Sequence, residues 1–175
     1  MASHDTQKRE KWLNLVQSLN PDIDPQAIRL MDEMRMVSHS LYQIGESSLI
    51  ATGLSYAQYR ILMSLFFCEQ MEGRSELNPS EISERQGTSR NTVSALIRNL
   101  EDEGLVERHL DKEDRRKFNI RLTEAGRALV HEHASKHMRI IAGCFSTLTG
   151  DEQDKLSQLL AKLSVNIARA REQLV

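Results

Sequence analysis

Residues 78–127 constrain the fold more strongly than any other part of the chain, because they carry closely spaced signals that start and stop helices. Asn78 can cap a short helix, and Glu81 stands three positions later, where its carboxylate can reach back to the cap. Gly87 is a natural residue to end this helix, since glycine readily adopts the left-handed conformation found at helix C-termini. The pattern predicts a short helix between the cap and the glycine.

Ser89 caps a second predicted helix, which Gly104 ends. Its apolar residues recur at the spacing of one buried helix face: Val93, Leu96, Ile97 and Leu100. The other face carries short hydrogen-bonding groups and two guanidinium groups, which suit contacts with base edges and phosphates. We interpret these residues as candidate DNA contacts: Ser89, Arg90, Asn91, Thr92, Ser94 and Arg98.

A charged hairpin follows, with strands expected over 105–110 and 117–122. We expect Arg115 and Arg116 at its tip to enter a narrow minor groove, with Asp114 holding the Arg116 guanidinium in place. The alternative is a charged loop that only faces water. A helix pair followed at once by such a hairpin favours the first interpretation, because it is the plan of a winged helix-turn-helix.

Three stretches resemble the MarR (multiple antibiotic resistance regulator) family of bacterial transcription factors: 55–62, 88–108 and 111–129. The most specific part is the Asp-x-Arg of the hairpin followed by Leu-Thr-Glu-x-Gly. The resemblance implies that residues 89–98 form the recognition helix and that Asp114 and Arg116 form the wing pair. It also implies a homodimer that binds a pseudopalindromic operator in double-stranded DNA, as a repressor released by a small molecule or an oxidant.

The expected fold class is mainly α-helical with a small β-hairpin wing, a winged helix-turn-helix flanked by long dimerisation helices. We expect one integrated domain with an N-terminal extension (1–24), a first dimerisation helix (25–54), the winged helix-turn-helix (55–127) and C-terminal dimerisation helices (128–175). The first of these long helices should reach about residue 51 and the next about residue 148. Apolar stripes on the long helices exceed what the DNA-reading module can cover, so a two-fold dimer is the simplest way to bury them.

A small-molecule effector needs a site between the long helices and the reading module. The candidate ligand contacts are His39 and Tyr42 on the first long helix, and Tyr59 and Met63 on the helix expected to begin after Ser55. The alternative for each of the four is ordinary packing in the core or at an interface.

The cysteines and histidines carry weaker signals. Cys68 and Cys144 lie beside large apolar residues, and we expect both to be buried, inert thiols. Histidines 131, 133 and 137 are expected to be exposed to solvent or at an interface. A His133–His137 pair leaves open a metal-responsive regulator, but no third ligand stands at a recognisable spacing, and we predict neither a metal site nor a cofactor.

Missing motifs and the distribution of charge argue against several other classes of protein. The sequence has no phosphate-binding glycine loop, nucleophile elbow or dinucleotide fingerprint, so we do not expect an enzyme. It has no long apolar run and no signal peptide, which predicts no membrane partner and a cytoplasmic protein. The net charge is −2, yet residues 85–127 carry +2 while residues 1–84 carry −5. This basic bias favours DNA as the partner, and a winged helix that binds only proteins is the remaining alternative.

Overall fold

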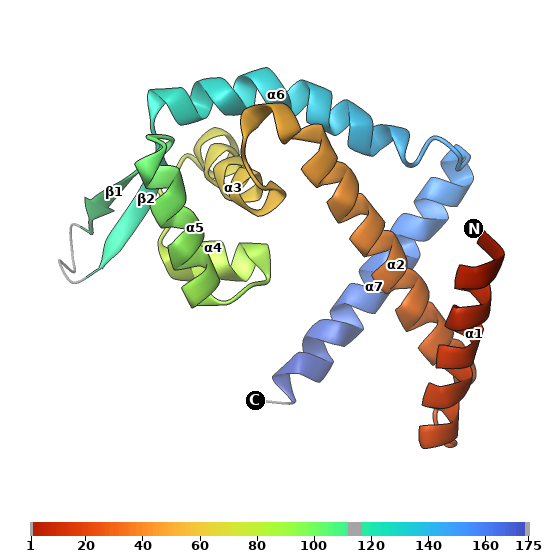
Figure 1. The fold of residues 1–175 in the computed structure, drawn as a ribbon. Coiled ribbons are helices and arrows are strands. Elements are labelled where there is room, and N and C mark those ends of the chain that lie inside the picture. Colours follow the sequence, from red (N-terminus) through yellow and green to blue (C-terminus); the bar gives the residue numbers. More distant parts are fainter. Residues whose placement is uncertain (1, 112–116, 174–175) are drawn as a thin grey trace. The chain divides into compact units, whose positions relative to one another are not determined.

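The computed structural model describes residues 2–111 and 117–173, and these are mainly helical with one two-stranded hairpin (Figure 1). The chain divides into two compact units, residues 1–47 and residues 48–175. Both the mainly α-helical class and the β-hairpin wing predicted from the sequence are confirmed. None of the described helices is both long enough and apolar enough to cross a membrane.

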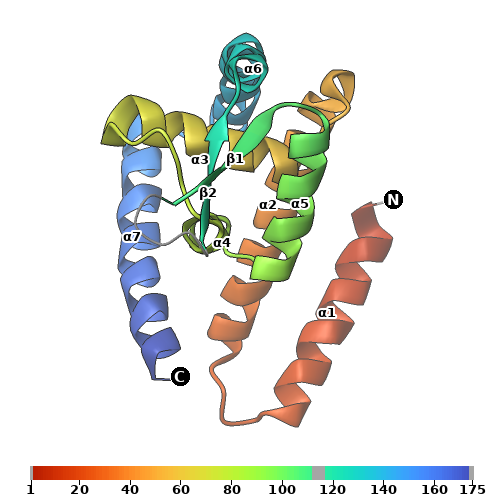
Figure 2. The same cartoon turned by 90° about the vertical axis from the view of Figure 1, so that its left-hand side faces the viewer.

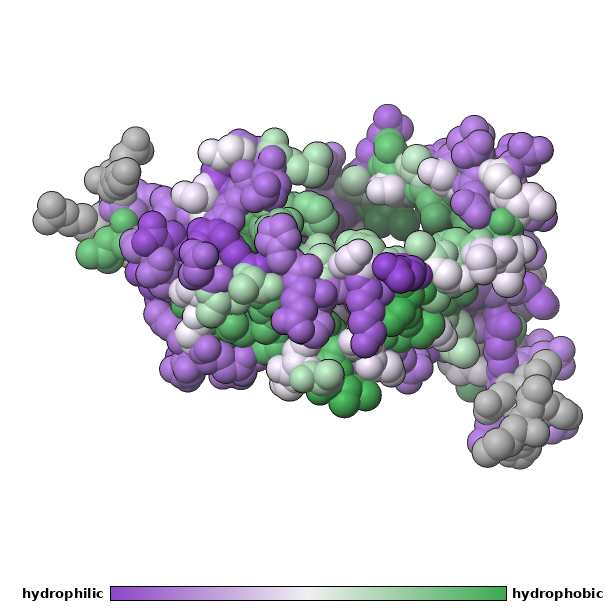
Figure 3. Space-filling view, turned by 90° about the horizontal axis from the view of Figure 1, so that it is seen from above, coloured by the Kyte–Doolittle hydropathy of each residue, from purple (hydrophilic) through white to green (hydrophobic). Residues whose placement is uncertain are grey.

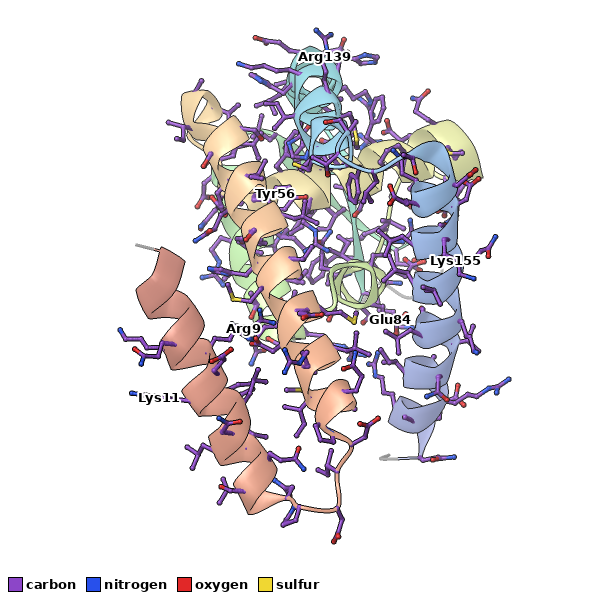
Figure 4. All side chains as sticks on the ribbon, turned by 90° about the vertical axis from the view of Figure 1, so that its right-hand side faces the viewer. Arg9, Lys11, Tyr56, Glu84, Arg139 and Lys155 are labelled. Carbon is purple, nitrogen blue, oxygen red and sulfur yellow. The ribbon has the colours of Figure 1, made fainter. Side chains whose placement is uncertain are left out.

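The N-terminal unit is a helical hairpin of α1 (Ala2–Leu19) and α2 (Pro25–Ser48). Arg9 lies on the side of α1 that faces α2, where its guanidinium pairs with the carboxylate of Asp32 (Figure 4). Arg35 donates a second hydrogen bond of 2.8 Å to that carboxylate, which is 2% exposed. The bonds from Arg35 and Arg9 lower the pKa of Asp32, so the buried group stays ionised and ties the two helices together.

The C-terminal unit is built around α3 (Tyr56–Glu72), which contacts α4, α5, α6 and β2 (Figure 2). Seven of its residues are buried, among them Tyr59, Leu62 and Met63. The remaining elements follow in chain order: η1 (Ile50–Thr52), α4 (Pro79–Gln86), α5 (Arg90–Asp102), β1 (Val106–Leu110), β2 (Phe118–Leu122), α6 (Glu124–Gly143) and α7 (Gly150–Glu172).

The predicted helix caps are confirmed. The Asn78 side chain accepts hydrogen bonds from the backbone N–H groups of Ser80 and Glu81, and the Glu81 carboxylate accepts one from the Asn78 N–H. The reciprocal boxes at Ser55 and Thr149 also form. Gly87 ends α4 with φ of 65°, a left-handed conformation that strains residues with a side chain.

Two helix ends differ from prediction. The first long helix stops at Ser48, before residue 51, because Leu49 leaves the helical conformation and a 3-10 turn follows. Helix α6 stops at Gly143, before residue 148, and the chain continues through tight turns such as Phe145 N–H to Ala142 C=O. Thr149 needs extended backbone to cap α7, and this conformation prevents α6 from running on.

The early end of α6 also corrects one cysteine prediction. Cys68 is buried as predicted, and burial raises the pKa of its thiol. Cys144 was expected to be buried but is exposed. The reason is that the last buried residue of α6 is His137, so the end of the helix lies beyond the part that packs on α3.

The hairpin is held by the hydrogen bonds between its own strands and also by a backbone bridge to the connection before α4. Strands β1 and β2 pair antiparallel, with Val106 opposite Leu122. Leu77, in the connection between α3 and α4, exchanges two backbone hydrogen bonds of 3.0 and 2.8 Å with Ile120. This isolated β-bridge was not predicted, and it fixes the base of the wing to the connection that leads into α4.

The Leu-Thr-Glu-x-Gly motif closes the module. Leu122 is buried, and the hydroxyl of Thr123 donates to the Gly104 carbonyl at 2.7 Å while also accepting from the Gly126 N–H. A Cβ atom on Gly126 would lie 2.1 Å from the carbonyl oxygen of Leu105. The first turn of α6 therefore touches the backbone between α5 and β1, and only glycine fits there.

Replacing Gly126 by alanine should lower the free energy of unfolding by about 1–3 kcal/mol, since the new methyl group forces backbone apart. Gly143→Ala in the same helix is the matched control, because nothing lies within 4 Å of its Cβ position. Chemical denaturation of the two variants measures the difference. Equal stabilities would show that the close approach at Gly126 does not constrain the fold.

Candidate nucleic-acid interface and adjoining cleft

Helix α5 has two chemically distinct faces. Val93, Ile97 and Leu100 are at most 1% exposed and belong to the core cluster. Rotating the helix about its own axis in either direction would expose these three apolar side chains to water. Their burial therefore fixes which face of α5 points outward. The helix begins where Ser89 accepts a hydrogen bond from the Thr92 N–H, as the sequence predicted.

The six predicted contact residues of this helix all lie on its exposed part: Ser89, Arg90, Asn91, Thr92, Ser94 and Arg98. The three hydroxyl groups make only local bonds, such as Ser94 Oγ to the Arg90 carbonyl at 2.8 Å. Within the described part of the chain, the side chains of Arg90, Asn91 and Arg98 make no hydrogen bond. Their donors and acceptors therefore remain open to an outside partner.

Ion pairing separates these two arginines from the others in the module. Arg108 pairs with Glu101 at 2.7 Å, and Arg121 pairs with Glu107, whose pKa it lowers. Arg85 and Arg127 pair with glutamates of α3. Among the described arginines from 85 to 127, the two without an ion-pair partner in the structure are Arg90 and Arg98. Uncompensated positive charge thus gathers on the exposed face of α5.

The predicted wing contacts cannot be placed in the same way. Asp114, Arg115 and Arg116 lie outside the described residues. The described base of the wing is well ordered by its surroundings: Asn119 donates to both Asp111 (3.0 Å) and Glu76 (3.3 Å). The hairpin therefore leaves the core from a fixed base next to α5.

A cleft of about 200 Å³ opens between α3, α4 and α6. Two of the predicted ligand contacts, Tyr59 and Met63, line it one helical turn apart. The Tyr59 ring is fully buried, its hydroxyl has no hydrogen-bond partner among the described residues, and burial raises the pKa of Tyr59 to about 12. His39 and Tyr42, the other two predicted contacts, lie on α2 in the N-terminal unit, where both are exposed. The remaining lining residues are Tyr56, Arg60, Ser64, Phe67, Arg85, Gln86, His137 and Met138.

His137 corrects a prediction. It was expected to be exposed or at an interface, but it is 5% exposed, and its Nδ1 lies 2.8 Å from the hydroxyl of Ser48. Its ring packs against the ring of Tyr56 in a tilted arrangement and against the ring of Tyr59 in a T-shaped one, at centroid distances of 5.4 and 5.2 Å. Burial lowers the pKa of His137, which favours the neutral imidazole. The packing of α6 on α3 buries this side of the helix.

The remaining histidines give no support to the metal-responsive alternative. His131 packs its ring against Phe66, and His133 lies beside Glu132. In residues 2–111 and 117–173, no group of three or more histidine, cysteine, aspartate or glutamate side chains is arranged to hold a metal ion.

Comparisons with known proteins agree with this geometry. A MarR family model matches residues 52–117. The chain is 29% identical to the transcriptional repressor MprA of Escherichia coli, over 88% of this chain and 85% of MprA. It is 26% identical to the transcriptional repressor YetL of Bacillus subtilis, over 91% of this chain and 89% of YetL. The structure of the S. aureus MepR–DNA complex matches with a TM-score of 0.69 and 29% identity, over 78% of this chain and 96% of MepR. The chain is similar to the MarR family in sequence and in fold.

These matches confirm the resemblance predicted from the sequence, and the structural neighbours confirm the winged-helix fold class. The transcriptional regulator SlyA shares the fold with a TM-score of 0.72 at 20% identity, over 83% of this chain and 99% of SlyA. The MarR-family relatives are transcriptional regulators rather than enzymes, as the absence of catalytic motifs predicted. The sequence did not predict Arg60, Ser64 and Gln86 as site residues, because nothing in their spacing signals the cleft that they line.

Proposed function

We propose that this protein is a MarR-family regulator, a sequence-specific DNA-binding repressor that binds a pseudopalindromic operator as a homodimer and is released by a small molecule. The observation that carries the proposal is the division of α5 into a buried apolar face and an exposed polar face with two unpaired arginines. A helix presented in this way fits a major groove.

The chemistry of the exposed face suits base readout. Arginine can donate two hydrogen bonds to guanine, and asparagine can pair with both edge groups of adenine. Arg90 and Asn91 stand in the first turn of α5, the part of a recognition helix that contacts base edges. The crystal structure of the relative MepR with DNA supports this use of the module.

The wing is the second proposed contact. Asp114, Arg115 and Arg116 have the chemistry for a minor-groove contact, since arginine is attracted to the negative potential of a narrow groove. The hairpin leaves the core beside α5, so its tip is proposed to reach the groove next to the one that α5 enters.

The proposed homodimer rests on exposed apolar surface. No described residue of α7 is buried, although the helix carries a stripe at the spacing of one face: Leu156, Leu159, Leu160, Leu163 and Ile167. Further apolar groups interrupt the hydrophilic surface around α6, where Met138 and Ile140 are exposed (Figure 3). Contiguous apolar surface of this kind marks an interface, and a second copy of the chain is the proposed partner.

The proposed effector site is the cleft between α3, α4 and α6. Six of its ten lining residues are aromatic or sulfur-containing, and its polar groups include the Tyr59 hydroxyl and the guanidinium groups of Arg60 and Arg85. This composition fits a small planar molecule with a polar substituent. His39 and Tyr42 stay predictions from the sequence.

Arg90→Ala and Asn91→Ala should relax base preference and weaken binding by about 1–3 kcal/mol at a cognate base pair. DNA fragments selected by the wild-type protein from a random pool, at two salt concentrations, provide the test sites. Arg139→Ala is the control, because it removes the same charge from an exposed position on α6 (Figure 4). If the variants lost the same affinity for every DNA sequence, the two α5 side chains would contact only phosphates. If the wild-type protein enriched no sequence from the pool, sequence-specific binding would be contradicted.

Leu160→Glu should convert the dimer to a monomer, because it places a carboxylate without a partner in the proposed interface. Gln158→Glu introduces the same charge on the opposite face of α7 and should leave the dimer intact. Light scattering coupled to size-exclusion chromatography measures the mass of each variant. A dimer that survives Leu160→Glu would remove α7 from the interface.

A further inference from the structure

The start of α5 depends on the end of α4, because only Gly87 and Thr88 separate Gln86 from the cap of α5. This short connection is held by hydrogen bonds within α4 and its turn. The N–H groups of Gly87 and Thr88 donate to the carbonyls of Glu84 and Ser83, both at 3.2 Å. Any shift of the last turn of α4 is therefore passed directly to the first turn of α5.

Three residues form a closed set of hydrogen bonds between this last turn and α3, and we name it the Gln86 ring. The side-chain amide of Gln86 donates to the hydroxyl of Ser64 at 3.0 Å. That hydroxyl donates to the backbone carbonyl of Arg60 at 2.9 Å. The Arg60 guanidinium completes the ring by donating to the backbone carbonyl of Gln86 at 3.4 Å.

A second polar link between α3 and α4 is too exposed to replace the Gln86 ring. In the ion pair between Arg85 and Glu72, the arginine side chain is 33% exposed and the glutamate side chain is 40% exposed. Exposed pairs of this kind contribute little because water and salt screen them. Hydrogen bonds require a narrower range of distances and angles than an exposed ion pair does. The half-buried Gln86 ring therefore restricts the position of α4 relative to α3 more tightly than the Arg85–Glu72 pair.

We propose that Gln86 is a positioning residue, which sets the place of α5 relative to α3 through the Gln86 ring and so controls operator affinity without touching DNA. All three ring residues also line the cleft between α3, α4 and α6. An occupant with a hydrogen-bond acceptor would compete for the Arg60 and Ser64 donors. The inference rests on the proposed role of α5 in DNA recognition.

The test compares Gln86→Ala and Ser64→Ala with two matched controls. Ser64→Thr keeps the hydroxyl, and Gln70→Ala removes the same side chain from an exposed position on α3. Two readouts are measured: hydrogen exchange of the Gly87 and Thr88 amides in the free protein, and affinity for DNA fragments that the wild-type protein enriches from a random pool. The exchange readout does not depend on DNA binding.

Gln86→Ala and Ser64→Ala should each speed exchange of the two amides about five- to tenfold and weaken binding to the enriched DNA by a similar factor. The double variant should be no worse than either single one, because both break the same ring. Binding to unrelated DNA should not change. Both controls should behave as the wild type.

Exchange and affinity that match the Gln70→Ala control would overturn the inference while leaving the proposed function intact. Faster exchange with unchanged affinity would also overturn it, since Gln86 would then order the turn without positioning α5. If the wild-type protein enriches no DNA sequence, the proposed function fails, and the inference about operator affinity fails with it, whatever the exchange rates show.

Discussion

The burial of Val93, Ile97 and Leu100 against the core is the interaction on which the rest of the structure depends. Burying side chains of this size stabilises the fold by about 1.5–3 kcal/mol each, so the three together hold the rotation of α5 firmly. Because that rotation is fixed, Arg90 and Arg98 must face outward, and their charge stays available for a partner. A change in the core would therefore alter recognition even though it touches no DNA.

The wing base belongs to the same rigid arrangement. Leu77 bridges to Ile120, and Thr123 bonds back to Gly104, so the hairpin is held both by the connection before α4 and by the turn after α5. Gly126 lets α6 approach that turn without a clash. The Leu-Thr-Glu-x-Gly motif therefore has a structural role in this chain, because it joins the end of α5, the hairpin and α6 within a few residues.

The features that could be predicted from the sequence are those determined by residues close together in the chain. Caps and helix ends around α4 and α5 were correct because each signal acts within four residues, as at Asn78 and Glu81. The exposed face of α5 followed from periodicity alone. Contacts between distant segments could not be predicted in this way: His137 is buried partly through Ser48, 89 positions away, and the Leu77–Ile120 bridge has no local signal. The Gln86 ring and the exposed Cys144 depend likewise on where helices meet and end. The predicted roles of the α5 residues in binding stay predictions, as do those of Asp114, Arg115 and Arg116.

The central claim is that the polar face of α5 enters a major groove, and protection of guanine from dimethyl sulfate tests it most directly. This reagent methylates guanine N7, which lies in the major groove beside the edge that arginine reads. On DNA enriched by the wild-type protein, a homodimer should protect two groups of guanines whose centres lie about one helical turn apart, roughly 34 Å. Guanines that stay fully reactive across a site that the protein occupies would contradict the account.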